Sequence, residues 1–157
     1  MFNLTTSTTI RAPIERVFDY MSTPENDFQW QYGTLATARL SEGASAMGSF
    51  FRSIGHLMGR RVVSTYEVTE YEPNKRYGFT SRSGPLHSQI SYTFEMADGS
   101  TKITMSVHAN AVNFFQVKEG ALSKGMKTQF RDNLALLKDL LEGRQILRIA
   151  EVVSPRA

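Results

Sequence analysis

Residues 8–30 read TTIRAPIERVFDYMSTPENDFQW, and this stretch determines the expected fold. The segment that leads into it, residues 3–10, is rich in Thr and is typical of a β-strand. Pro13 suits the first turn of a helix. Apolar residues then follow at the spacing of one helix face: Ile14, Val17, Phe18 and Met21. Pro24 begins a second short helix, which ends at Trp30 and has acidic residues in its first turn. We therefore expect one strand followed directly by two short helices.

From Gly33 onward the sequence predicts a series of short strands separated by turn residues. The turns include Glu72-Pro73-Asn74 and Asp98-Gly99, the second of which is a strong hairpin signal. The predicted strands cover residues 35–40, 49–58, 62–71, 77–82, 88–96 and 102–111. Because the loops are short and leave no room for a parallel crossover, we expect an antiparallel meander.

The last third of the chain predicts one long amphipathic helix. Its apolar residues recur at steps of three and four: Leu122, Met126, Phe130, Leu134, Leu137 and Leu141. Gly120 and Gly125 each weaken its first turns by about 1 kcal/mol relative to Ala. We therefore expect a movable mouth made of residues 111–125 and of the loops near Gly43 and Gly84.

Composition limits the class of protein. The chain has 157 residues, with 41% hydrophobic and 21% charged residues, which fits one globular domain. The net charge is +3, and the basic residues form only short pairs, so no nucleic-acid partner is expected. The absence of cysteine excludes disulfides, thiolate catalysis and Cys-ligated zinc. The sequence shows neither a signal peptide nor a membrane span, and we expect a soluble cytoplasmic protein.

The order of one strand, two short helices, six strands and a long helix resembles the helix-grip fold of the START-like (SRPBCC) superfamily, in its polyketide cyclase/dehydrase-like branch. The likeness rests on residues 8–30, on Gly59-Arg60-Arg61 followed by residues 64–73 (STYEVTEYEP), on residues 77–80 (YGFT) and on residues 98–104 (DGSTKIT). The resemblance implies an α+β fold in which a curved antiparallel sheet of about seven strands surrounds the C-terminal helix. It implies a ligand-binding domain over residues 1–145 and leaves residues 146–157 as an apolar tail.

The family resemblance also implies a cavity for a hydrophobic ligand, and strand parity indicates which side chains face it. In residues 88–96 the inward face is shared by Ile90, Tyr92, Phe94 and Met96, and in residues 62–71 it includes Ser64 and Tyr66. The residues expected to bind the ligand are Trp30, Tyr66, Phe79, Tyr92, Met105, Met126 and Phe130. Two alternatives stay open: the tyrosines are either core residues or hydroxyls that orient a ligand, and Trp30 either anchors its helix or forms a wall at the cavity mouth.

His56 is the best candidate for a catalytic base, since imidazole titrates near neutral pH. If Phe50 faces inward, Arg52 and His56 enter the cavity together; if Phe51 faces inward, both are solvated. The three histidines lie on different elements without a ligand spacing, so neither a metal nor a cofactor is expected.

Three functions fit these observations. The leading one is binding of a small hydrophobic ligand that is aromatic, polyketide-like or lipid-like. The alternatives are a cyclase or dehydratase in which His56 is the base and Tyr66 or Tyr92 polarises a carbonyl, and a non-catalytic interaction or chaperone-like module. The apolar tail is expected either to dock on its own domain or to form a homodimer.

Overall fold

The computed structural model describes residues 2–110 and 117–143. Seven antiparallel strands form one sheet with the order β1-β7-β6-β5-β4-β3-β2. The strands are β1 (Phe2–Ile10), β2 (Thr34–Arg39), β3 (Phe50–Leu57), β4 (Arg60–Glu72), β5 (Arg76–Ser83), β6 (His87–Ala97) and β7 (Ser100–Asn110). The helices are α1 (Ile14–Met21), the 3₁₀ turn η1 (Pro24–Asn26), α2 (Asp27–Trp30) and α3 (Glu119–Glu142).

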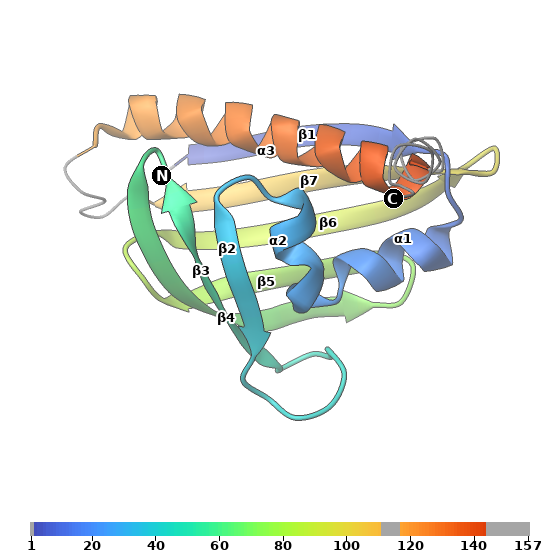
Figure 1. Ribbon diagram of the computed structural model, residues 1–157, viewed down its shortest axis with the longest axis horizontal. Coiled ribbons are helices and arrows are strands. Elements are labelled where there is room, and N and C mark those ends of the chain that lie inside the picture. The colour runs from blue at the N-terminus through green and yellow to red at the C-terminus, as the bar shows by residue number, and fades with distance from the viewer. Residues whose placement is uncertain (1, 111–116, 144–157) are drawn as a thin grey trace, which may run out of the picture.

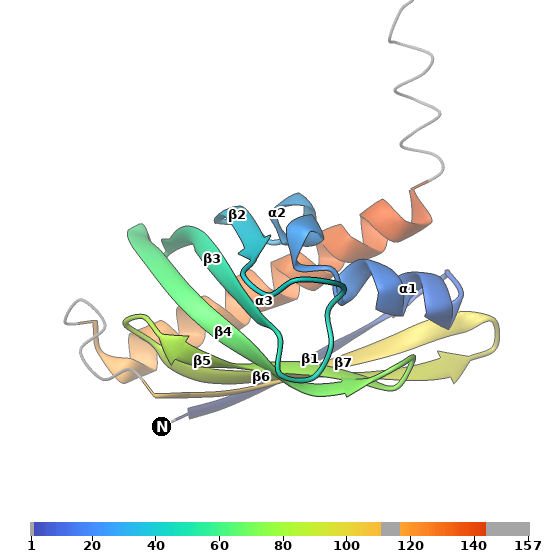
Figure 2. The ribbon, with the colours of Figure 1, turned by 90° about the horizontal axis from the view of Figure 1, so that it is seen from below.

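All helices lie on the same side of the curved sheet. Figure 1 shows α3 running along β1 and β7, with α1 and α2 beside it, and Figure 2 shows the sheet curving up around these helices at its β2–β3–β4 end. The meander from β2 to β7 and the helix-grip arrangement are confirmed. β1 departs from sequence order, since it pairs with β7 at the edge opposite β2.

The two short helices are fixed by aromatic packing. Phe18, on the apolar face of α1, lies edge-on to Tyr71 and Phe94, with ring centroids 5.5 and 5.1 Å apart. Such pairs contribute about 1 kcal/mol beyond the area that they bury. This contact holds α1 on the sheet, so that α2 reaches over its concave face.

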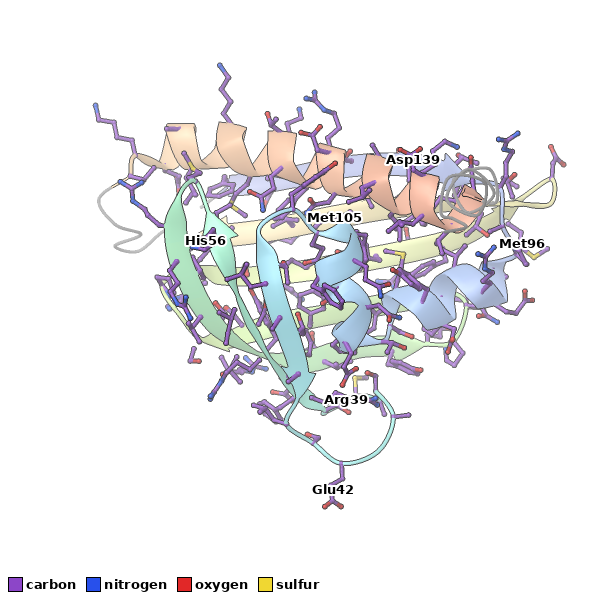
Figure 3. The ribbon with its side chains drawn as sticks, viewed as in Figure 1. Arg39, Glu42, His56, Met96, Met105 and Asp139 are labelled. Atoms are coloured by element: carbon purple, nitrogen blue, oxygen red, sulfur yellow. The ribbon has the colours of Figure 1, made fainter. Side chains whose placement is uncertain are left out.

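One inward assignment from strand parity is wrong. Met96 shares the parity of Tyr92 and Phe94, yet it is 75% exposed. It pairs with Thr101 directly before the turn at Asp98 and Gly99, where the β6–β7 hairpin extends past the helices (Figure 3). Strand parity tells which face of the sheet a side chain is on. The side chain is buried only where a helix also covers that face.

The two glycines in the first turns of α3 differ in their surroundings. A Cβ on Gly125 would lie 3.0 Å from the sulfur of Met58, in the β3–β4 turn, whereas a Cβ on Gly120 would meet nothing within 4 Å. The bare Cα of Gly125 therefore lets this turn close on α3. The movable mouth stays a prediction, and its residues 111–116 lie outside the described residues, as does the apolar tail.

Candidate ligand-binding cavity

A cavity of about 120 Å³ lies between the sheet and helices α2 and α3. The structure places all seven predicted ligand-binding residues around it: Trp30, Tyr66, Phe79, Tyr92, Met105, Met126 and Phe130. They come from α2, from β4 to β7 and from α3, so the curvature of the sheet brings together residues that are up to 100 positions apart. Their role in ligand binding stays a prediction. A cavity of about 150 Å³ can hold benzene, so this one has the size of a single aromatic ring.

Aromatic rings form one wall of the cavity. Phe51 stacks on Tyr66 with ring centroids 5.3 Å apart and 26° between the ring planes. Phe79 lies edge-on to both, at 5.2 and 5.1 Å. Tyr92 lies 6.4 Å from Phe79 and continues the wall. Close packing of large rings leaves these side chains few alternative rotamers, so the wall is shaped before any ligand arrives.

Two of the buried polar side chains around the cavity come from α2. Asp27 and Trp30 are three positions apart, and residues at this spacing share a helix face. Both line the cavity, with exposed fractions of 7% and 1%. Among the described residues, the Trp30 Nε1–H has no hydrogen-bond partner. The cavity therefore has one end that is lined by a carboxyl group and by an indole N–H without a partner.

Burial controls the protonation of Asp27. Loss of water around the carboxylate, and then the nearby negative charge of Glu25, raise the pKa of Asp27 well above its ordinary range. Glu25 itself accepts a 2.8 Å hydrogen bond from the Arg39 guanidinium. Burial tends to raise the pKa of Glu25, but the hydrogen bond and charge of Arg39 outweigh it and lower that pKa. Of the two neighbouring carboxyls, Asp27 is the one whose surroundings favour the protonated form.

The cavity tyrosines are neutral hydrogen-bonding groups. Burial, followed by the charge of Asp27, raises the pKa of Tyr92. Burial also raises the pKa of Tyr66, although hydrogen bonding with Ser64 and Ser88 offsets part of this effect. Both hydroxyls can therefore donate or accept, but neither is poised to lose its proton near neutral pH.

Helix α3 fixes the turn that follows α2. The Tyr32 N–H donates to Asn133 Oδ1, and Gln129 Nε2 donates to the Tyr32 carbonyl, both at 2.8 Å. The next residue, Gly33, has φ +88°, and a Cβ there would lie 2.5 Å from the His56 carbonyl oxygen. Only glycine fits such a position without displacing β3. These contacts hold α2, with Asp27 and Trp30, over the cavity.

The structure settles the orientation of β3. Phe51 is buried, and Ser53, Gly55 and Leu57 line the cavity with it. Arg52 and His56 are exposed, so the second of the two alternatives holds. His56 borders the cavity near Gly33, but its side chain is exposed to solvent. The side chain expected to be the catalytic base is therefore exposed, and its catalytic role stays a prediction.

Sequence reasoning missed Asp27 and Asn133. The prediction treated the acidic residues of the segment PENDFQW as first-turn charges, although Asp27 shares the face of Trp30. Asn133 stands seven residues after Met126, which is two helical turns, and this spacing was a signal that it faces inward. Each is a polar residue at an apolar position of its helix, and such positions are where functional groups occur.

Within residues 2–110 and 117–143, no three His, Asp or Glu side chains converge as metal ligands. In the same ranges, no helix combines the length and the apolar character that crossing a membrane requires.

Comparisons with known proteins agree with this architecture. The family model described as polyketide cyclase/dehydrase and lipid transport matches residues 1–142. A START superfamily protein from Mycobacterium smegmatis has a similar structure, with a TM-score of 0.78 and 14% identity over 90% of this chain and 97% of that one. A protein from Thermus thermophilus has a TM-score of 0.71 and 19% identity over 96% and 100% of the two chains. Among curated proteins, none matches this sequence.

A third similar structure is the Aha1 dimer from Colwellia psychrerythraea, with a TM-score of 0.62 and 20% identity over 90% of this chain and 97% of that one. At such identities the three structures show that the fold is shared. The homodimer expected from the apolar tail stays a prediction for this chain.

Proposed function

Since the chain belongs to the polyketide cyclase/dehydrase and lipid transport family, we propose that it binds a small hydrophobic ligand in the cavity between its sheet and α3. The observation that carries this proposal is the aromatic wall of Phe51, Tyr66 and Phe79 facing the Met126 and Phe130 side of α3. Pockets for small molecules are mostly apolar, with a few placed polar groups, and this cavity has that composition.

The cavity favours an aromatic ligand of about one ring. Its volume of about 120 Å³ suits such a ligand, and ring-against-ring contacts add to the burial of apolar area. A longer polyketide or lipid needs the cavity to widen. The partly exposed lining residues mark where widening costs least: Gln31, Thr34, Ser53, Leu57, Val62, Tyr66, Gln129 and Phe130.

Ligand binding is better supported than a reaction in which His56 is the catalytic base. A cyclase or dehydratase in which His56 is the base needs that imidazole inside the cavity, and the His56 side chain is exposed. The hydroxyls of Tyr66 and Tyr92 remain as groups that could polarise a carbonyl. Ligand binding requires only the apolar volume and the polar end.

Titration of the protein with ethylbenzene, followed by ¹H–¹⁵N NMR, tests this proposal. We expect saturable shifts of amides next to the cavity. Phe130→Ala should weaken binding by about fivefold, because Phe130 lines the cavity and its apolar contacts are lost. The matched variant Phe28→Ala removes a ring that is 53% exposed and should leave the affinity unchanged. Absence of binding to the folded protein, or equal effects of both variants, would contradict the proposal.

A further inference from the structure

The polar end of the cavity has a definite hydrogen-bonding character. The indole Nε1–H of Trp30 is buried and, among the described residues, without an acceptor. An indole nitrogen can only donate, and a buried donor without a partner is unfavourable. The group therefore fits a ligand that brings an acceptor to it.

Asp27 presents a second donor on the same helix face. Burial and the charge of Glu25 raise the pKa of Asp27, which favours the protonated carboxyl, and the O–H of that form can donate. The hydroxyls of Tyr66, Tyr77 and Tyr92 are within electrostatic reach of this carboxyl, and Asp27 itself lines the cavity. Two donors at one end of an apolar cavity match the two lone pairs of a carbonyl oxygen.

We propose that Asp27 and Trp30 form an acceptor-binding site, in which the Asp27 carboxylic acid O–H and the Trp30 Nε1–H donate to one carbonyl oxygen of a neutral aromatic ligand. The site specifies an aryl ketone or a similar neutral carbonyl compound over the corresponding hydrocarbon. This inference rests on the proposed function, because it assigns the orientation of a ligand within the same cavity.

The lining disfavours charged ligands of either sign. No Lys or Arg is among the described residues that line the cavity, and the His56 side chain is exposed, so a carboxylate would enter without a buried counter-charge. An ammonium ion would meet the positive end of the Trp30 N–H dipole, and pairing it with Asp27 would require that carboxyl to ionise in a buried place. Taking an ion out of water costs several kcal/mol when no partner replaces the water. A neutral acceptor avoids both penalties.

Several titratable groups from neighbouring elements lie near Asp27, and their pKa shifts differ from that of Asp27. Glu25, on η1, is tied to Arg39 on β2 and has a lowered pKa. The tyrosines Tyr20 on α1, Tyr66 on β4, Tyr77 on β5 and Tyr92 on β6 all have raised pKa values and stay neutral. From α3, Gln129 and Asn133 are uncharged. Loss of the Asp27 proton thus removes one donor and adds a negative charge facing the ligand oxygen.

The test compares acetophenone with ethylbenzene, which has nearly the same shape and no oxygen. Affinities are measured by NMR titration for the wild-type protein, Asp27→Asn, Asp27→Leu and Trp30→Phe. Asp19→Asn is the matched control, since Asp19 is an exposed aspartate on α1 outside the cavity. The measured quantity is the ratio of the two affinities, which cancels effects of a variant on the apolar part of the cavity. Acetophenone labelled with ¹³C at its carbonyl carbon reports hydrogen bonding directly, because donation to the oxygen moves its resonance downfield.

We expect the preference for acetophenone to fall about tenfold in Trp30→Phe and in Asp27→Leu, the loss expected for one hydrogen bond, with ethylbenzene still bound. In the wild-type protein and in Asp19→Asn the preference should fall as the pH rises through the pKa of Asp27. In Asp27→Asn, whose amide still donates, it should be kept at every pH. The bound carbonyl resonance should be less downfield in Trp30→Phe than in the wild-type protein.

An unchanged ratio and carbonyl resonance in Trp30→Phe, or tighter binding of benzoate or 1-phenylethylamine than of acetophenone, would overturn the acceptor site. Binding of ethylbenzene together with such a result leaves the proposed function standing. Binding of neither compound overturns both. If Asp27→Leu fails to fold, Trp30→Phe and the pH dependence of Asp27→Asn still decide the question.

Discussion

Trp30 lies edge-on to Tyr92, with ring centroids 6.3 Å apart and 66° between the ring planes. Tyr92 stacks in turn on Tyr77, at 6.4 Å and 9°. The indole is thereby tied to β6 and β5, although it comes from a helix of four residues. This contact places the single tryptophan of the chain at the wall of the cavity, where its fluorescence can report on what occupies it.

The first prediction concerns this fluorescence. Acetophenone should change the emission of Trp30 in a saturable manner, because the indole lines the cavity and is almost completely buried. Phe130→Ala should shift the midpoint to higher concentration, and Phe28→Ala should not. A change that rises linearly with acetophenone in all three proteins would indicate collisional quenching and no bound state.

The second prediction concerns the pH dependence of stability. An aspartate in the unfolded chain ionises near pH 4, whereas burial and Glu25 keep Asp27 protonated in the folded protein to higher pH. The stability that this group contributes is full below pH 4 and is lost as the pH rises through its folded pKa, by up to about 1.4 kcal/mol per pH unit. Asp27→Asn should therefore become more stable than the wild-type protein as the pH rises.

Urea unfolding at several pH values between 4 and 8 measures this effect, with Asp19→Asn as the control. Glu25 and Glu142 have lowered pKa values, so their contribution has the opposite sign and is lost as the pH falls through those values. The wild-type protein and Asp27→Asn share this contribution, so it cancels when their free energies of unfolding are subtracted. A difference between Asp27→Asn and the wild-type protein that does not vary with pH would show that Asp27 is ionised in both states.

The third prediction uses the two glycines of α3. Gly120→Ala should stabilise the protein by about 0.5–1 kcal/mol, because its Cβ meets nothing and alanine favours the helix. Gly125→Ala gains the same propensity but places a methyl group against Met58, so it should stabilise less and admit ethylbenzene faster. Thermal unfolding and NMR line-shape analysis provide the two measurements. Equal stabilisation and equal association rates would show that the Met58 contact does not control access.

The fourth prediction concerns the attachment of the α2–β2 turn to α3. Asn133→Ala leaves the Tyr32 N–H without its acceptor and should lower the free energy of unfolding by about 1–3 kcal/mol. It should also weaken acetophenone binding, because α2 is then held less firmly over the cavity. Asp132→Ala, on the exposed face of the same helix, is the control for urea unfolding and for the titration. If Asn133→Ala unfolded like the control, the hydrogen bond would not position α2.

Most of the fold could be predicted because its signals are local and repeated. Alternation in β6 placed Tyr92 inward, and the helical stripe placed Met126 and Phe130 inward, so the cavity wall followed from two periodicities. The orientation of β3 was left open, since Phe50 and Phe51 are adjacent and both apolar. It is decided by contacts made elsewhere in the chain, such as the approach of Gly33 to His56.

The polar end of the cavity could not be predicted in the same way. Asp27 is ordinary for the first turn of a helix, and its character depends on burial by strands from distant parts of the sequence. The division after residue 145 and the behaviour of the tail stay predictions, because residues 144–157 lie outside the described part of the chain. The surroundings of Asp27 depend on tertiary contacts, which the periodicity of the sequence does not encode.

The methionine methyl groups give the most direct test that the cavity is the ligand site. Met105 and Met126 line the cavity, whereas Met47 and Met96 are exposed at 65% and 75%. Figure 3 labels one of each pair, Met105 and Met96. In protein labelled with ¹³C at the methionine methyl groups, ethylbenzene should shift Met105 and Met126 upfield through its ring current and give nuclear Overhauser effects to both. Met47 and Met96 should not respond. Shifts confined to Met47 or Met96, or no response from Met105 and Met126 at saturating ethylbenzene, would contradict the account.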